Sequence, residues 1–165
     1  MNNEYSSNSL ETNDPLVFIE KGYIDIKDDV AFKRIYEACN CFGHNYKGFQ
    51  RGGAYHPYRD DVTLWFPKMY ANGAWRNSIS TDEYCIYERP VNPAEVEEHM
   101  EFHISRDLKR IVFAHERDSH GKFMYHFKGE FEIDVIESRK EKFLVWKRIA
   151  ERVQTYPPKG RRNIE

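Results

Sequence analysis

Hydrophobic and polar residues alternate most regularly between residues 123 and 135. Phe127, Phe131 and Ile133 alternate there with charged residues, which is the period-two pattern of a strand with one buried face. Another apolar run, 110–116, precedes this strand, and the polar segment 117–122 between the two predicts a turn. We therefore expect a hairpin whose solvent-facing side carries the charged residues Lys128, Glu130, Glu132 and Asp134.

Shorter apolar runs predict the other strands. The segment 40–61, which contains four glycines and Pro57, is expected to be a long irregular loop rich in aromatic side chains. The three strands between residues 62 and 87 are expected to form a β-meander, with a turn at Asn72-Gly73. Extended segments are predicted at 16–20, 23–26, 62–66, 74–79, 84–87 and 143–146.

Two helices are predicted, and their number and order define the fold class. Asn92 followed by Pro93 and Glu95 is typical of a helix N-terminus, which predicts a helix over 92–104. Asp28 and Asp29 predict the cap of another helix that ends near residue 40. The order of strands and helices does not alternate as in a parallel α/β sheet. We expect an α+β fold, a small curled β-sheet or β-barrel with two or three flanking helices.

The composition predicts one folded domain. The 165 residues are 40% hydrophobic and 15% aromatic, which is enough apolar surface for a core and excludes disorder of the whole chain. We expect a flexible leader over 1–14, a single domain over 15–155 and a loose basic tail over 156–165. Three cysteines without a CxxC pair indicate a reducing compartment, and no apolar run is long enough to span a membrane. The sequence predicts a cytoplasmic protein with no membrane partner.

The small net charge of −2 hides an uneven distribution. Residues 82–107 hold eight acidic and two basic residues, whereas residues 138–165 hold nine basic and three acidic residues. A basic segment beside aromatic residues is typical of a surface that contacts nucleic-acid phosphates. The candidate phosphate contacts are Lys147, Arg148 and Arg152. The alternative is a charged segment that simply faces the solvent.

The glycine-rich segment 47–59 offers donors beside aromatic rings. Adjacent glycines allow the backbone to approach a ligand closely, and basic side chains supply hydrogen bonds to a phosphate. The segment lacks the Lys-Ser/Thr ending of a P-loop, and the glycines could also form an ordinary tight turn. Its candidate ligand-binding residues are Arg51, Gly52, Gly53, Tyr55, His56 and Arg59.

The segment 75–82 is the most distinctive in the chain. Trp75 and Asn77 lie on one face of the expected strand, and Ser80 and Asp82 follow at its end. An aromatic wall with nearby polar groups is the combination that binds a flipped base. The alternative is that Trp75 anchors the core while the polar residues form a turn.

Signals for catalysis are weak. His99 and His103 are one helical turn apart, a spacing that suits a metal, but the HExxH pattern is missing. Glu130, Glu132 and Asp134 superficially suggest a metal-dependent nuclease, although an amphipathic strand explains them more simply. We expect no catalytic residue, no metal ligand and no cofactor.

Several short motifs together resemble a known superfamily. The motifs are Leu-Trp-Phe-Pro at 64–67, Trp-Arg-Asn-Ser-Ile-Ser at 75–80, Arg-Ile-Val-Phe-Ala at 110–114, Tyr-His-Phe-Lys-Gly-Glu-Phe at 125–131 and Val-Trp-Lys-Arg-Ile at 145–149. In their order, the chain is similar to PUA-like modules of the EVE, ASCH and SRA type, which occur in bacterial genome defence. The resemblance covers residues 15–155.

The resemblance implies a function. It implies binding of DNA or RNA, with a modified base in an aromatic pocket, and a nuclease or helicase as a protein partner. Transferred by position, Trp65 and Trp75 would form the pocket wall, and Asn77, Ser80 and Asp82 would contact the edge of the base. The alternatives that stay open are a small metal-dependent nuclease and a protein-interaction adaptor.

Overall fold

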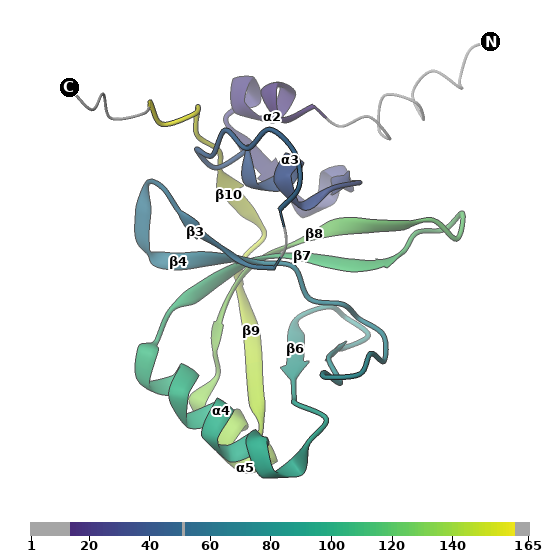
Figure 1. Ribbon diagram of the computed structural model, residues 1–165, viewed down its shortest axis with the longest axis vertical. Coiled ribbons are helices and arrows are strands. Elements are labelled where there is room, and N and C mark those ends of the chain that lie inside the picture. Colours follow the sequence, from purple (N-terminus) through teal and green to yellow (C-terminus); the bar gives the residue numbers. More distant parts are fainter. Residues whose placement is uncertain (1–13, 51, 161–165) are drawn as a thin grey trace.

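A computed structural model describes residues 14–50 and 52–160 of the chain, so residues 1–13 of the expected leader and Arg51 lie outside the described residues. The fold is α+β, as predicted, with a strongly curled mixed sheet (Figure 1). Among the described residues the helices are α2 (Pro15–Lys21), α3 (Ile35–Cys39), α4 (Pro93–Arg106) and α5 (Val135–Glu141), with a 3-10 turn η1 (Ile26–Asp28). The strands are β1 (Tyr23–Asp25), β2 (Ala31–Phe32), β3 (Ala54–His56), β4 (Arg59–Trp65), β5 (Ser78–Ile79), β6 (Cys85–Glu88), β7 (Lys109–Arg117), β8 (Phe123–Ile133), β9 (Leu144–Ala150) and β10 (Arg152–Gln154).

The main sheet follows the order β3-β4-β7-β8-β9-β6-β5, and β2 pairs with β8 outside this path. Strands β4 and β7 are parallel, and the chain between them forms β5, β6 and α4, whereas β1 and β10 form a separate two-stranded sheet. The prediction of a β-meander over 62–87 is wrong, because β4 and β5 lie near opposite edges of the sheet. Short apolar runs identify strands but carry no information about which strands pair.

The hairpin β7–β8 is confirmed and projects to one side of the molecule (Figure 1). It contains a bulge next to Gly129, whose φ of +107° is unfavourable for other residues. A Cβ at Gly129 would lie 2.5 Å from the Ala150 carbonyl oxygen, so the sheet can curl tightly at this point. The prediction that β8 exposes its charged residues to solvent is partly wrong. Lys128 and Glu130 are buried and form ion pairs with residues of other strands and loops.

The N-terminal region differs from the prediction. Residues 15–21 form α2 rather than an extended segment, because Asp14 caps the helix, Pro15 occupies its first turn and Gly22 ends it in the left-handed conformation. The expected helix over 28–40 is also wrong, since β2 interrupts it and leaves α3 as its last part. The strand predicted at 23–26 is confirmed as β1.

Two further predictions are confirmed, and one helix was missed. Helix α4 begins after the predicted cap Asn92, whose side chain accepts a hydrogen bond from the Ala94 N–H. The run predicted at 143–146 forms the first part of β9. The sequence pattern did not reveal α5, which is short and polar and is started by a hydrogen bond from the Glu137 N–H to Asp134.

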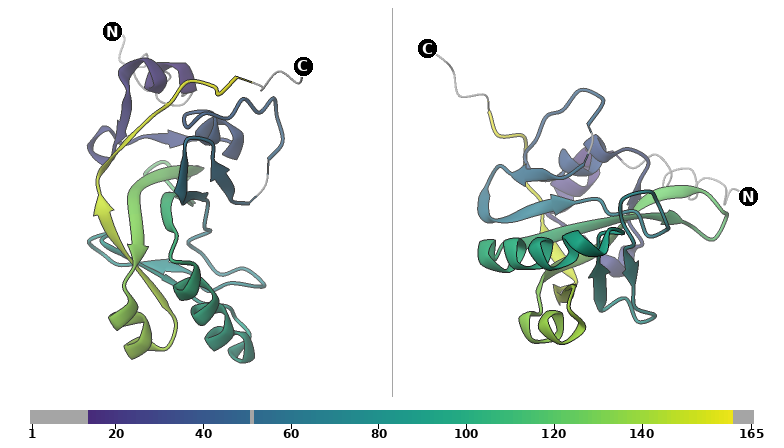
Figure 2. Two further views of the ribbon diagram at one scale, coloured as in Figure 1. Left: turned by 90° about the vertical axis from the view of Figure 1, so that its left-hand side faces the viewer. Right: turned by 60° about the horizontal axis from the view of Figure 1, so that its bottom comes forward.

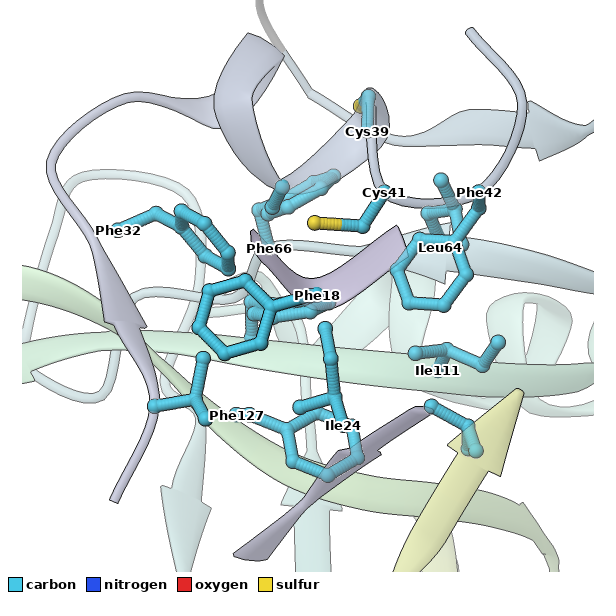
Figure 3. Close-up of a cluster of buried hydrophobic side chains, with 14 of the residues drawn as sticks. Phe18, Ile24, Phe32, Cys39, Cys41, Phe42, Leu64, Phe66, Ile111 and Phe127 are labelled. Carbon is cyan, nitrogen blue, oxygen red and sulfur yellow. The ribbon is translucent and has the colours of Figure 1, made fainter. Parts of the chain in front are cut away.

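The buried hydrophobic side chains form two clusters. The larger cluster packs α2, α3 and the β1 segment against β4, β7 and β8, and Figure 3 shows its aromatic and aliphatic side chains. The smaller cluster includes Val112, Phe131 and Trp146, with Met100 from α4. Both α4 and α5 lie at the end of the molecule opposite α2 and α3 (Figures 1 and 2). No helix in the described part of the chain is long and apolar enough to cross a membrane.

The expected tail begins with packed residues. Tyr156 stacks on Tyr58 with ring centroids 4.5 Å apart, and the Lys159 N–H donates to the Gly43 carbonyl. Residues 161–165 lie outside the described part of the chain.

Candidate functional site

A cavity of about 290 Å³ lies where the end of β4 meets the segment that leads into β5. Its volume is near the lower limit of about 300–1,000 Å³ that is usual for small-molecule sites, which suits a group the size of one nucleobase. Five residues predicted from the sequence line this cavity: Gly52, Gly53, Trp65, Trp75 and Asn77. The remaining lining residues are Phe66, Pro67, Lys68, Asn72 and Glu88.

Glu88 places a buried carboxylate on the cavity wall. Its Oε1 accepts hydrogen bonds of 3.0 Å from Arg110 and from the Trp146 indole N–H, and its Oε2 lies 3.3 Å from His99 Nε2. Burial by itself raises the pKa of Glu88, but the positive charge of Arg110 and the surrounding donors outweigh it and lower the pKa to about 2. Glu88 is therefore ionised at neutral pH and acts purely as a hydrogen-bond acceptor.

Glu88 was not predicted from the sequence as a site residue, although its position in β6 carries a signal. Glu88 lies two residues after Ile86 on β6, so the two side chains point to the same side of the strand, and Ile86 is fully buried. An acidic residue on the apolar side of a strand is rarely retained without a partner.

Arg110 fixes the aromatic wall of the cavity. Its guanidinium carbon lies 4.2 Å from the ring centroids of both Trp65 and Trp146. This arrangement combines two cation–π contacts with the ion pair to Glu88, and Arg110 is itself buried. Trp65 is thereby held in place by strand β4 and by the Arg110–Glu88 pair.

An Asx turn positions Trp75 at the cavity. The Asn72 Oδ1 accepts hydrogen bonds from the backbone N–H groups of Ala74 and Trp75, which confirms the predicted turn at Asn72-Gly73. The Trp75 ring packs edge-on against His99 at 5.0 Å. Trp75 is half-buried, so it is not a fully buried core anchor.

Residues 75–79 pair with residues 86–90 in a two-stranded ribbon that ends with β5 and β6, and Asn77 adds polar groups on the same side of this ribbon as Glu88. Its Oδ1 accepts a hydrogen bond from the Arg89 backbone N–H at 3.3 Å. Within the described ranges its Nδ2 has no partner, which leaves two donors for a ligand. Asn77 and Glu88 therefore combine donor and acceptor groups on one cavity.

The two glycines let the backbone approach the cavity closely. Gly52 has a φ of +73°, and a Cβ at Gly53 would lie 3.0 Å from the Leu64 carbonyl oxygen. Their predicted neighbour Arg51 lies outside the described residues.

Ser80 and Asp82 lie outside the cavity. The Ser80 hydroxyl donates to Asp82 Oδ1 at 2.7 Å, and the same oxygen accepts from the Tyr84 N–H at 3.0 Å. The two residues thus form the turn that joins β5 to β6, in agreement with the alternative of a polar turn at these residues.

Tyr55, His56 and Arg59 line a separate groove of about 690 Å³. Arg59 forms a two-bond ion pair with Glu130 and a second pair with Asp61. Burial, reinforced by the nearby positive charge of Arg59, lowers the pKa of His56 to about 4, so this ring is neutral at pH 7. This group does not join Trp65 and Trp75 at the smaller cavity.

The predicted phosphate contacts already have partners within the molecule. Lys147 lies 3.8 Å from Glu132, and Arg152 pairs with Asp25 at 2.9 Å. The Arg148 guanidinium donates to the Lys128 carbonyl at 3.4 Å. As phosphate contacts these three residues remain a prediction.

The candidate metal ligands serve other contacts. His99 faces Glu88, and burial beside Arg110 lowers the pKa of His103 to about 4. Glu130 on β8 binds Arg59, and Asp134, which follows β8, caps α5. Among residues 14–50 and 52–160, no group of three His, Cys, Asp or Glu side chains could hold a metal ion.

Comparisons with known proteins agree with this architecture. Residues 17–155 match the model of the SET and RING associated domain, SRA. Among solved structures the chain is similar to the 5-hydroxymethylcytosine-specific restriction enzyme AbaSI, with a TM-score of 0.78 and 37% sequence identity. The alignment covers 94% of this chain and 51% of that enzyme, so the chain spans about half its length. No curated protein matches. The family match confirms the resemblance predicted from the sequence.

Proposed function

Since the chain belongs to the SET and RING associated domain family, we propose that it is a DNA-binding module that recognises a modified cytosine flipped into the cavity beside Trp65 and Trp75. The observation that carries this proposal is the meeting of two tryptophans, the Asn77 amide and the ionised Glu88 carboxylate around a space of about 290 Å³. Aromatic rings stack on a base, and the polar groups read its edge.

The polar groups match cytosine better than thymine or uracil. Cytosine presents an amino donor beside acceptors, and the ionised Glu88 can accept from that amino group while Asn77 Nδ2 donates to an acceptor. A base with a carbonyl in place of the amino group would bring an acceptor against the carboxylate. The AbaSI enzyme is described as specific for 5-hydroxymethylcytosine, which supports the same base class for this chain.

The context of the function is genome restriction and defence, as for the restriction enzyme in the comparison. About half of that enzyme has no counterpart in the chain. We propose that a nuclease partner supplies DNA cleavage. Incubation of the chain alone with modified DNA and Mg²⁺ should leave the DNA intact, whereas nicking that Glu132→Ala abolishes would favour the metal-dependent nuclease.

Binding measurements test the pocket directly. Fluorescence anisotropy should show tighter binding to a duplex with one 5-hydroxymethylcytosine than to the same duplex with cytosine, and Trp75→Ala should remove this preference, at a cost of about 1–3 kcal/mol. Phe102→Ala removes an exposed aromatic side chain from α4 and serves as the control. An unchanged preference in Trp75→Ala would refute the assignment.

A further inference from the structure

The ribbon that forms the cavity wall carries two arginines directly opposite each other. The strand register pairs Trp75 with Pro90 and Ser78 with Tyr87, which places Arg76 opposite Arg89. The Arg76 N–H donates to the Arg89 carbonyl at 2.8 Å, in agreement with this register. Side chains alternate between the two faces of the ribbon, so the arginines lie on the face opposite Asn77 and Glu88.

On that opposite face the arginines line grooves of about 390 Å³ each. The two grooves share Arg76, Arg89, Glu141 and Phe143, and Lys142 lines one of them. The Arg89 guanidinium lies 4.8 Å from the Phe143 ring, which holds it at the groove. Lys142 has a φ of +69° as the residue that ends α5, so the turn presents it beside the arginines.

The two arginines at this groove form no ion pair with the described residues of the chain. Glu141 is the acidic residue that shares the grooves. Like charges directly opposite each other on paired strands destabilise a sheet. The contrast with Arg59 and Arg152, which are paired with carboxylates, indicates that Arg76 and Arg89 accommodate an external anion.

We infer that this groove binds a backbone phosphate of the DNA strand whose base enters the cavity. The inference rests on the proposed function and adds a phosphate site to it. Arginine forks bind phosphate oxygens through paired hydrogen bonds, and Lys142 adds a nearby charge. Because the cavity and the groove lie on the two faces of one β-ribbon, the bound phosphate and the flipped base belong to the same short stretch of the strand.

The salt dependence of binding tests the inference. We compare the wild type with Arg76→Gln/Arg89→Gln on a duplex with one 5-hydroxymethylcytosine and on its unmodified counterpart. Each lost phosphate contact lowers the slope of log K against log salt by about 0.9, so the double variant should lose about one to two. Between 50 and 200 mM salt, wild-type affinity should fall up to about 12-fold further than that of the variant. Both duplexes should be affected equally.

A control removes two positive charges elsewhere. Lys21→Gln/Lys27→Gln acts at α2 and at η1, which follows soon after it, and should leave the slope unchanged. Helix α2 lies at the opposite end of the molecule from α5 (Figure 1). Arg76 is exposed, so Arg76→Gln alone should fold with a melting temperature no lower than that of the wild type. Its salt slope should decrease by about half as much as that of the double variant.

Three results would overturn the inference: an unchanged slope in the arginine variants, an equal decrease in the lysine control, or a loss restricted to the modified duplex. The inference is also overturned if inorganic phosphate competes for the groove at constant ionic strength while the arginine variants leave the salt slope of DNA binding unchanged. The groove would then bind a free anion. Trp75→Ala separates this test from the proposed function, because it should remove the preference for the modified base and leave the salt slope intact.

Discussion

Glu88→Gln is the substitution that most directly probes the cavity, because it removes one charge and keeps the shape of the side chain. The amide oxygen can still accept from Arg110 and Trp146, in place of Glu88 Oε1. Arg110 nevertheless loses its buried counterion, and breaking a buried ion pair in this way costs about 3–5 kcal/mol. With both hydrogen bonds kept, we expect a decrease of about 3 kcal/mol in the free energy of unfolding, measured by urea denaturation.

The same change should alter base selectivity. The hydrogen bonds from Arg110 and Trp146 hold the amide oxygen inward, which leaves the amide N–H groups at the position of Glu88 Oε2. An amino group on the base then meets a donor, whereas a carbonyl meets a favourable partner. The preference for 5-hydroxymethylcytosine over 5-hydroxymethyluracil should fall about 10- to 100-fold, as expected from about 1–3 kcal/mol of discrimination.

Anisotropy titrations with the two modified oligonucleotides measure this ratio. Glu97→Gln, on the exposed side of α4, removes the same charge and should change neither the stability nor the preference. A Glu88→Gln protein that loses stability but keeps the wild-type ratio would refute the reasoning, because Glu88 would then support the fold without contacting the base.

Two further predictions concern the scaffold. Gly129→Ala should lower the free energy of unfolding by about 3 kcal/mol, because the φ of Gly129 is +107° and a Cβ there would meet the Ala150 carbonyl oxygen. The control Gly48→Ala has open space around it and should change the free energy of unfolding by less than about 1 kcal/mol. Equal losses of the two variants in urea denaturation would contradict this prediction. Burial lowers the pKa of His56 from 6.5 to about 4, so the unfolded chain takes up a proton at a higher pH than the folded protein. The free energy of unfolding should therefore fall by up to about 3 kcal/mol as the pH drops from 6.5 to 4. Thermal melts should show a smaller decrease for His56→Gln, and an identical decrease in both proteins would contradict this prediction.

Local signals in the sequence account for the elements that were predicted correctly. The hairpin β7–β8 follows from period-two alternation around a polar turn, and α4 follows from Asn92 and Pro93 at its start. The same kind of signal was present before α2, where Asp14 precedes Pro15, but the apolar run after it favoured a strand. The periodicity of a short apolar run is compatible with either a helix or a strand, and the capping residues decide between the two.

Pairing between distant strands was not predictable from the sequence. The alignment of β4 with β7, and of β6 with β9, depends on contacts between residues far apart in the chain. Trp75 and Asn77 were predicted from their residue types and period-two spacing, and Trp65 from the family resemblance; all three line one cavity. Ser80 and Asp82 carry equally suitable groups, but their side chains satisfy each other in a turn. Residue type therefore identified candidates, and pairing geometry separated them.

The separation of faces on the ribbon explains why adjacent residues can have different roles. Asn77 and Glu88 are opposed across the strands and face the cavity, whereas Arg76 and Arg89, one position away, face the opposite groove. A shift of one residue in this register would bring the arginines against the aromatic wall and the carboxylate into the solvent. The Asx turn at Asn72 and the hydrogen bond from the Arg89 N–H to Asn77 hold the register. Base selectivity thus depends on turn and backbone contacts as much as on the residues that touch the base.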